Sequence, residues 1–171
     1  MHIQVETFTV HKRVPLTISR GTTAQTTNIW LRIEQDGIEG WGEASPFSVG
    51  SHPQTTEILL SKFHSIAPLL TSVTPCDRQK IEHLLQDLHL PSAVWTGLDL
   101  ALHDWLGKRV GLPLWQLWGL DQTRIVPTSV TIGISTPEAA QQRMRSWLAL
   151  TTVKAVKVKL GSPAGVEADR A

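Results

Sequence analysis

The sequence is poor in cysteine and lacks tyrosine: Cys76 is the single cysteine among 171 residues. One cysteine excludes an internal disulfide and a cysteine-based zinc site, and it indicates a reducing compartment. No apolar run is long enough to span a bilayer. Residues 1–10 also lack the basic start and the apolar block of a signal peptide. These absences predict a cytoplasmic protein with no membrane partner.

An excess of charge of one sign is missing as well. The chain has 16 lysine and arginine residues against 15 acidic residues, a net charge of +1 at pH 7. This balance argues against nucleic acid as the main partner. With 41% hydrophobic and 18% charged residues, the chain has the composition of a globular protein. Its length suits one substantial domain, or a small domain followed by part of another.

Alternating apolar residues near the N-terminus predict a small antiparallel sheet. Strand patterns occur at residues 3–10, 28–34 and 38–44. Asp36 and Gly37, between the last two strands, are a hairpin-turn signal. The polar stretch 16–24 and the proline-containing stretch 45–54 are predicted to be loops.

Three helical patterns follow the strands, at residues 53–70, 77–88 and 92–111. Ser92 is the candidate N-cap of the third helix, and Gly111 ends it just before Pro113. Strands first and helices after them predict an α+β domain over residues 1–120.

A strand-helix-strand unit is predicted for residues 121–171. Strand patterns at 129–134 and 154–161 flank a helix that Thr136 caps and Pro137 opens. The spacing of the two strands suits a right-handed parallel crossover. We therefore expect two neighbouring parallel strands with a helix on one face.

The second of these strands carries its charges in an unusual place. One face holds Lys157 and Lys159, and the other holds three aliphatic residues, Val156, Val158 and Leu160. In a closed parallel barrel the outer face is covered by helices, and inward side chains near the carboxyl end reach the active-site mouth. We therefore expect Thr131, Lys157 and Lys159 inside the first strands of a TIM-type (β/α) barrel. Because such a barrel needs eight strands, a chain that ends at Ala171 is expected to be a fragment or to need a second chain.

Four motifs in this order resemble the enolase superfamily, in particular its muconate lactonizing enzyme/mandelate racemase branch and the dipeptide epimerases of the L-Ala-D/L-Glu type. They are Gly40-Trp41-Gly42-Glu43-Ala44, then Ala101-Leu102-His103-Asp104 with Gly111-Leu112-Pro113-Leu114 and Leu117-Trp118-Gly119, then Thr131-Ile132-Gly133-Ile134 with Ser135-Thr136-Pro137-Glu138-Ala139, and last Lys157-Val158-Lys159-Leu160-Gly161. The resemblance implies a capping domain at residues 1–120. It also implies that residues 121–171 form the first strand, first helix and second strand of the barrel.

The resemblance further implies a magnesium enzyme that removes the proton α to a carboxylate and stabilises the resulting enediolate. Lys159 is then the general base, and Lys157 remains cationic beside it. Thr131 and Arg20 are expected to contact a small-molecule substrate, either a dipeptide or an N-acyl amino acid. The stretches 16–25 and 45–54 are expected to form a lid over that substrate.

Each candidate residue also has a purely structural interpretation. Lys159 is then a solvated strand lysine, Arg20 a surface arginine and Thr131 a hydroxyl hydrogen-bonded inside the barrel. Glu43 is expected to brace the sheet. His52 is expected to be solvent-exposed, with a substrate contact as the alternative.

No metal site is expected within this chain. In the family, the carboxylate ligands for Mg2+ and the opposing lysine lie on later barrel strands, so Glu167 and Asp169 are not candidate ligands. Asp99 and His103 have helical i, i+4 spacing and form a candidate metal pair. Without a third ligand, a structural pair is the simpler interpretation.

The sequence therefore predicts the N-terminal part of a magnesium-dependent amino-acid or dipeptide epimerase, an isomerase that is inactive as this chain alone. The full-length enzyme could form a homo-oligomer. One alternative keeps the chemistry: a muconate-type cycloisomerase or an o-succinylbenzoate synthase. The other is a non-catalytic, truncated or split fragment that needs a partner chain. Substrate and stereochemistry are not fixed by the sequence.

Overall fold

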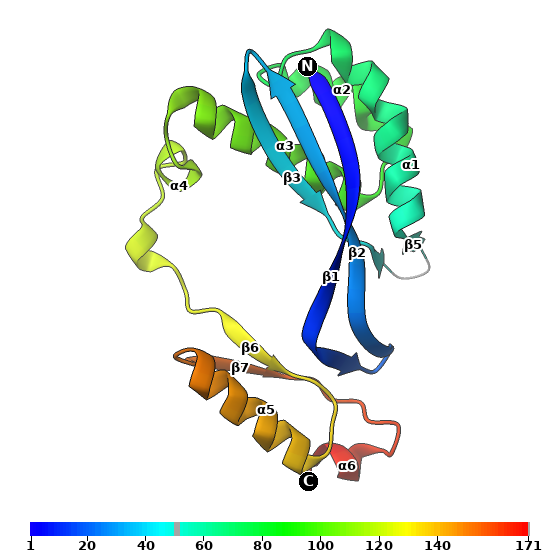
Figure 1. The fold of residues 1–171 in the computed structure, drawn as a ribbon, viewed down its shortest axis with the longest axis vertical. Coiled ribbons are helices and arrows are strands. Elements are labelled where there is room, and N and C mark those ends of the chain that lie inside the picture. The colour runs from blue at the N-terminus through cyan, green and yellow to red at the C-terminus, as the bar shows by residue number, and fades with distance from the viewer. Residues whose placement is uncertain (50–51, 171) are drawn as a thin grey trace. The chain divides into compact units, whose positions relative to one another are not determined.

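The computed structural model describes residues 1–49 and 52–170 (Figure 1). Contacts within the chain divide it into two compact units. The first unit contains Met1–Val10 and Thr26–Gln122, and the second contains His11–Gln25 and Thr123–Ala171. No helix within the described ranges has the length and apolar character needed to cross a membrane.

A three-stranded antiparallel sheet carries the first unit, in the order β1-β2-β3. Its strands are β1 (His2–Ile18), β2 (Gly21–Gln35) and β3 (Ile38–Ala44). The predicted turn is confirmed, because Asp36 and Gly37 both have positive φ, 56° and 73°, as a two-residue hairpin turn requires. Alternation along β2 buries one face of the sheet, which presents Ile29, Leu31 and Ile33.

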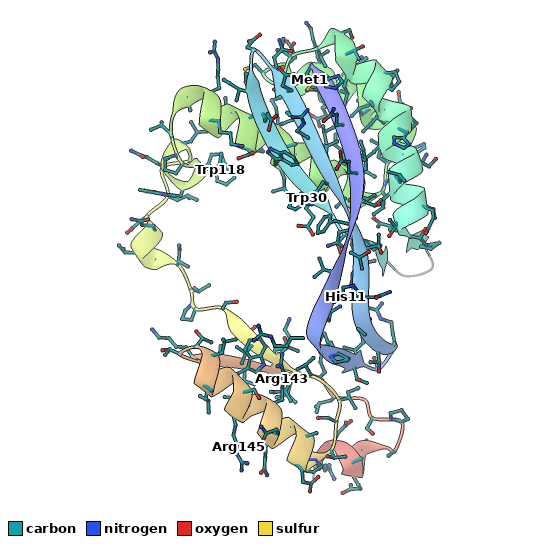
Figure 2. All side chains as sticks on the ribbon, viewed as in Figure 1. Met1, His11, Trp30, Trp118, Arg143 and Arg145 are labelled. Atoms are coloured by element: carbon teal, nitrogen blue, oxygen red, sulfur yellow. The ribbon has the colours of Figure 1, made fainter. Side chains whose placement is uncertain are left out.

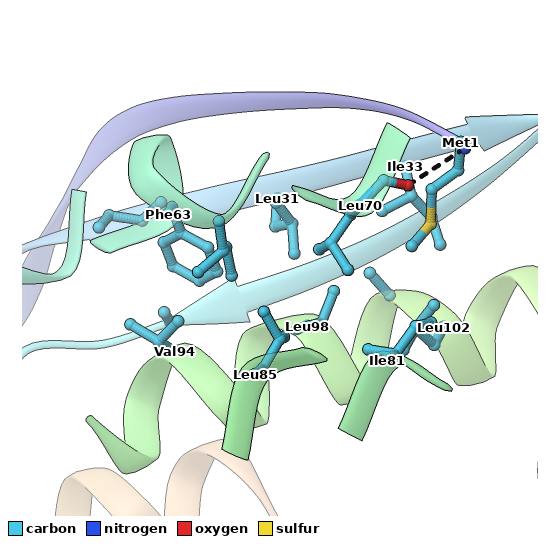
Figure 3. Close-up of a cluster of buried hydrophobic side chains, with 14 of the residues drawn as sticks. Met1, Leu31, Ile33, Phe63, Leu70, Ile81, Leu85, Val94, Leu98 and Leu102 are labelled. Carbon is cyan, nitrogen blue, oxygen red and sulfur yellow. Dashed lines mark hydrogen bonds between the residues drawn. The ribbon is translucent and has the colours of Figure 1, made fainter. Parts of the chain in front are cut away.

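Helices follow the sheet in the first unit, as predicted. They are α1 (Thr56–Ile66), α2 (Arg78–Leu85), α3 (Ser92–Val110) and α4 (Leu114–Leu117), with 3₁₀ turns at Ala67–Ser72 and Gln86–Leu88. A further 3₁₀ turn, Gln122–Arg124, begins at the last residue of this unit. Apolar side chains of α1, α2 and α3 meet the buried face of the sheet and form the core (Figure 3). The N-terminal ammonium of Met1 closes one end of this core by donating to the carbonyl oxygens of Leu70, at 3.4 Å, and Val73, at 2.8 Å.

The helix ends confirm one predicted cap and correct another. Gly111 ends α3 with a φ of +72°, as expected. Ser92 is not the N-cap of α3; Pro91 holds that position, and the Ser92 hydroxyl is hydrogen-bonded with the Gln54 side chain. Gln54 Oε1 also accepts from the Ala93 N–H at 3.1 Å. The start of α3 is therefore capped from another segment, which a local motif does not reveal.

The two predicted loops are largely strand. β1 runs to Ile18 and β2 starts at Gly21, so the stretch 16–24 is the tip of a long hairpin whose turn is Ser19-Arg20. In the stretch 45–54, β4 (Phe47–Val49) pairs antiparallel with β5 (His52–Gln54). Residues 50 and 51 of that predicted lid lie outside the described residues, as does the side chain of His52. The loop prediction was therefore wrong at 16–24, and within 45–54 it was wrong for Phe47–Val49 and His52–Gln54.

The second unit confirms the predicted strand-helix-strand order. β6 (Ser129–Ile132) and β7 (Ala155–Val158) pair in parallel, and α5 (Pro137–Leu150) connects them. The Thr136 side chain accepts from the Ala139 N–H and caps α5, with Pro137 in its first turn. A short helix, α6 (Val166–Arg170), follows β7. The described residues contain this parallel pair but no closed barrel.

Candidate functional site

The predicted site residues of the barrel strands lie at neighbouring register positions on β6 and β7. Thr131 is directly opposite Lys157 in the register of the parallel pair. One residue past β7, the Lys159 N–H donates to the Ile132 carbonyl oxygen at 2.9 Å, so the strand pairing extends to Lys159. Alternation then places the Lys157 and Lys159 side chains on the face that Thr131 shares. The structure therefore brings these three residues together at the carboxyl end of the pair.

The two lysines differ in how far they are covered. Lys157 is exposed, whereas Lys159 and Thr131 are half-buried. The aliphatic face of β7 is exposed too, with relative exposures of 44% for Val156 and 58% for Val158. The expected helical cover over that face is therefore absent from the described residues. The covered face belongs to β6, where Val130 and Ile132 are 7% and 6% exposed.

The tip of the β1–β2 hairpin, residues 16–20, lies at the carboxyl ends of both parallel strands. The Ile134 N–H, just after β6, donates to the Thr17 carbonyl oxygen at 3.0 Å. A Cβ on Gly133 would lie 2.9 Å from that same oxygen, so only glycine allows this approach. After β7, a Cβ on Gly161 would lie 3.4 Å from the Ser19 Cβ. The turn that contains the exposed Arg20 is thus held beside the ends where Thr131 and Lys159 lie.

A groove of about 480 Å³ runs between this hairpin and the β6–α5 segment. Its lining residues are Lys12, Arg13, Val14, Pro15, Leu16, Thr17, Thr131, Ile132, Gly133, Ile134, Ser135, Ala139, Arg143 and Trp147. Thr131 lines the groove, but Lys157, Lys159 and Arg20 do not. The groove therefore contains one of the four predicted site residues.

Trp147 of α5 is hydrogen-bonded to the backbone of Thr131, a contact that the sequence did not reveal. Its indole Nε1–H donates to the Thr131 carbonyl oxygen at 3.2 Å. The Arg143 guanidinium stacks over the Trp147 ring, 4.3 Å from its centroid. Figure 2 shows Arg143 on the side of α5 next to the strands and Arg145 on the opposite side. Trp147 lies at helical spacing from Ala140 and Met144, which is typical of a packing residue. The need of a covered indole N–H for an acceptor was the available signal.

Two acidic candidates from the sequence, Glu43 and Asp99, are bound to other side chains of the protein. Glu43 accepts a hydrogen bond of 2.5 Å from the Asn28 side chain and so braces the sheet, as expected. Asp99 is paired with Arg78 and with His103, whose Nδ1 lies 3.2 Å from Asp99 Oδ2. Within residues 1–49 and 52–170, no group of three His, Cys, Asp or Glu side chains is placed to hold a metal ion. The Asp99 carboxylate is bound within the protein, to Arg78 and to His103.

Comparison with known families gives a clear assignment. Residues 2–119 match the model described as "Mandelate racemase / muconate lactonizing enzyme, N-terminal domain". The chain belongs to this family. The resemblance to the enolase superfamily is thereby confirmed, and the sheet with its helices is the N-terminal domain of a mandelate racemase/muconate lactonizing enzyme family member.

Curated relatives of this family member include several dipeptide epimerases. The hydrophobic dipeptide epimerase of Flavobacteria bacterium (strain MS024-2A) is 37% identical over 95% of this chain and 45% of its own length. That of Roseobacter litoralis is 34% identical over 100% of this chain and 48% of its own length. The chain thus spans about half the length of the curated relatives it matches.

Solved structures show the same fold. The dipeptide epimerase from Enterococcus faecalis V583, complexed with Mg and L-Leu-L-Tyr, has a TM-score of 0.83 and 23% identity, covering 98% of this chain and 47% of that one. A substrate-liganded complex of the L-Ala-D/L-Glu epimerase from Bacillus subtilis has a TM-score of 0.85 and 24% identity, covering 99% and 47%. At this identity the matches show the fold alone.

Proposed function

We propose that this family member is the N-terminal part of a dipeptide epimerase, with residues 1–120 as its capping domain and 121–171 as the start of its barrel. The observation that carries the proposal is the placement of Lys157 opposite Thr131, with Lys159 one step further along the same face. The similarity to dipeptide epimerases over nearly the whole chain supports the same class of substrate.

The proposed reaction is inversion at the carbon α to a carboxylate. The neutral amine of Lys159 takes the α-proton, and the electron pair of the broken C–H bond moves into the carboxylate to give an enediolate. Return of a proton to the opposite face, from a group outside this chain, restores the C–H bond with inverted configuration. Lys157 supplies a fixed positive charge beside the developing negative charge.

Thr131 and Arg20 are proposed to hold the substrate. The half-buried Thr131 hydroxyl lies on the same face as the lysines, and Arg20 lies in the turn held beside the strand ends. An arginine binds a carboxylate through two parallel hydrogen bonds, which fixes orientation. A dipeptide carboxylate therefore suits Arg20, and we assign the lid role of residues 16–25 to this hairpin tip.

The described residues of this chain do not provide a set of ligands for the magnesium ion that this chemistry uses. The Enterococcus faecalis structure is a complex with Mg, yet no three-ligand group occurs in the described parts of this chain. We propose that the magnesium ligands lie in a part of the protein beyond this sequence, and the steps above use the chain's own side chains alone.

Exchange of the substrate α-proton with solvent deuterium tests the proposal. The full-length protein is mixed with a dipeptide library in D2O, and deuterium at the α-carbon is followed by proton NMR. We expect exchange from both substrate configurations in the natural protein and loss on one stereochemical face in Lys159→Ala. Retained exchange on both faces in this variant contradicts the proposal. Lys154→Ala is the matched control, because Lys154 is an exposed lysine just before β7.

The intact mass of the protein from its source cell separates this proposal from a non-catalytic fragment. A mass near twice the 18.9 kDa of this chain agrees with relatives of which the chain spans 45% and 48%. A mass near 18.9 kDa means that catalysis requires a separate partner chain. The cycloisomerase and o-succinylbenzoate synthase alternatives predict no epimerised dipeptide from this library, so the same experiment distinguishes them from an epimerase.

A further inference from the structure

The carboxylate of Asp169 on α6 binds the backbone that follows β7. Its Oδ2 accepts from the Gly161 N–H at 2.7 Å, and its Oδ1 accepts from the Ser162 N–H at 3.0 Å. Both oxygens are thus used on two successive amides. Hydrogen bonds to an ionised carboxylate are stronger than neutral ones, so this pair of bonds defines the path of the chain just after the strand.

The backbone around Lys159 is held by two hydrogen bonds, one at Lys159 itself and one at Gly161. On one side, its own N–H donates to the Ile132 carbonyl oxygen at 2.9 Å. On the other side, Gly161 is held by Asp169 only two residues later. Gly161 has a φ of +102°, a conformation that L side chains rarely adopt, which lets its N–H turn toward α6. The backbone of Lys159 therefore has little freedom to rotate.

The neighbouring charges on α6 do not compete for Asp169. Arg170 Nη1 is bound to Glu167 Oε1 at 2.9 Å. Glu167 is fully on the exposed side, while Asp169 is half-buried against residues 161 and 162. Two acids on one short helix thus have different tasks, and only Asp169 contacts the strand end.

We propose that Asp169 is a positioning residue for Lys159. The inference rests on the proposed function, in which Lys159 takes the α-proton. Asp169 does not contact the substrate; it fixes the loop that sets the direction of the lysine side chain. Misplacement of a catalytic group by about 1 Å costs about 10²-fold in rate, so the loop geometry has a direct effect on turnover.

Amide hydrogen exchange on the 171-residue chain tests the contact without any need for activity. We expect the Gly161 and Ser162 amides to exchange about tenfold faster or more in Asp169→Ala than in the natural chain. Asp169→Glu, which keeps the carboxylate, is expected to restore part of the protection. Glu167→Gln is the matched control on the same helix and leaves both amides unchanged. Unchanged exchange in Asp169→Ala overturns the proposal.

Kinetics of the full-length protein test the consequence for catalysis. Asp169→Ala is expected to lower kcat by about 10²-fold with little change in KM, because the substrate contacts stay in place. Faster amide exchange combined with an unchanged kcat overturns the positioning role while leaving the proposed function intact. A Lys159→Ala variant that still exchanges the α-proton on both faces instead overturns the proposed function, and with it the reason for positioning Lys159.

Discussion

Gly42 of β3 and Gly97 of α3 meet so closely that a Cβ on Gly42 would overlap the Gly97 carbonyl oxygen. Gly40 has the same relation to the Ala101 carbonyl oxygen, one helical turn further along α3. The alternating glycines of the Gly40-Trp41-Gly42 motif therefore line the buried face of β3 and let the helix backbone approach the strand. The motif has a packing role in this unit, independent of any chemistry.

Gly42→Ala is predicted to destabilise the protein by about 3 kcal/mol. The added methyl group meets backbone atoms of α3, which cannot rotate away as a side chain does. The free energy of unfolding in urea, followed by circular dichroism, measures the effect. Gly97→Ala is the informative comparison, because the nearest neighbour of its Cβ is a side-chain atom, Phe63 Cζ at 3.0 Å, and alanine favours the helix by about 1 kcal/mol. Equal losses in the two variants would contradict this account.

Gly133→Ala is predicted to push the hairpin tip off the end of β6. Its Cβ would lie 2.9 Å from the Thr17 carbonyl oxygen, too close for the Ile134 N–H to reach that oxygen. The Ile134 amide should then exchange about tenfold faster or more, and limited proteolysis should cut within residues 11–25. Thr128→Ala, an exposed change just before β6, should leave both readouts as in the natural protein.

Trp147→Phe is predicted to cost about 1 kcal/mol of unfolding free energy, since phenylalanine keeps the ring but leaves the Thr131 carbonyl oxygen without its indole donor. Urea unfolding measures the loss. Trp118→Phe is the control, because the Trp118 residue is 54% exposed and its ring contact with His103 survives the change. A loss as large at position 118 would show that the hydrogen bond is not the cause.

Asp77→Asn is predicted to lower the melting temperature at neutral pH. The backbone N–H and the hydroxyl of Thr74 both donate to Asp77 at 2.9 Å, and they hold the pKa of this carboxyl below its ordinary value of 3.8. Because the folded pKa is the lower one, the stabilisation is complete above pH 3.8 and is lost as the pH falls through the folded value.

Thermal melts from pH 7 to pH 2 check the Asp77 prediction. The difference between the natural chain and Asp77→Asn should shrink steadily below pH 3.8. Asp87→Asn, which changes an exposed acid in the turn after α2, should melt like the natural chain at pH 7. A constant difference across the whole range would assign the effect to something other than the carboxylate charge.

Periodic patterns in the sequence predicted most of the secondary structure, and contacts between distant segments decided the rest. The stripes of α1, α2 and α3 and the parallel order of β6 and β7 follow from local spacing. The strand structure of the stretch 16–24 does not follow from local spacing, because polar threonines and a glycine are typical of loops. It forms strand because its partner lies across the hairpin and because Thr17 is bound by Ile134.

The candidate site was predictable in part for the same reason. The strand alternation that groups Lys157, Lys159 and Thr131 is local information, and the register agrees with it. The contacts of Asp169 with Gly161 and of Trp147 with Thr131 depend on how two helices return to the strands. Such contacts are set by tertiary packing, which residue spacing alone does not encode.

The exposed aliphatic face of β7 has a consequence for the life of the chain in a cell. Val156, Val158 and Leu160 are 44%, 58% and 61% exposed, beside a strand edge that pairs with no other strand among the described residues. Such surfaces promote edge-to-edge association. They are also the surfaces by which chaperones and proteases sort incompletely assembled proteins. While this edge is uncovered, the chain is expected to self-associate or to be degraded, so its abundance is expected to depend on how soon the strand is paired.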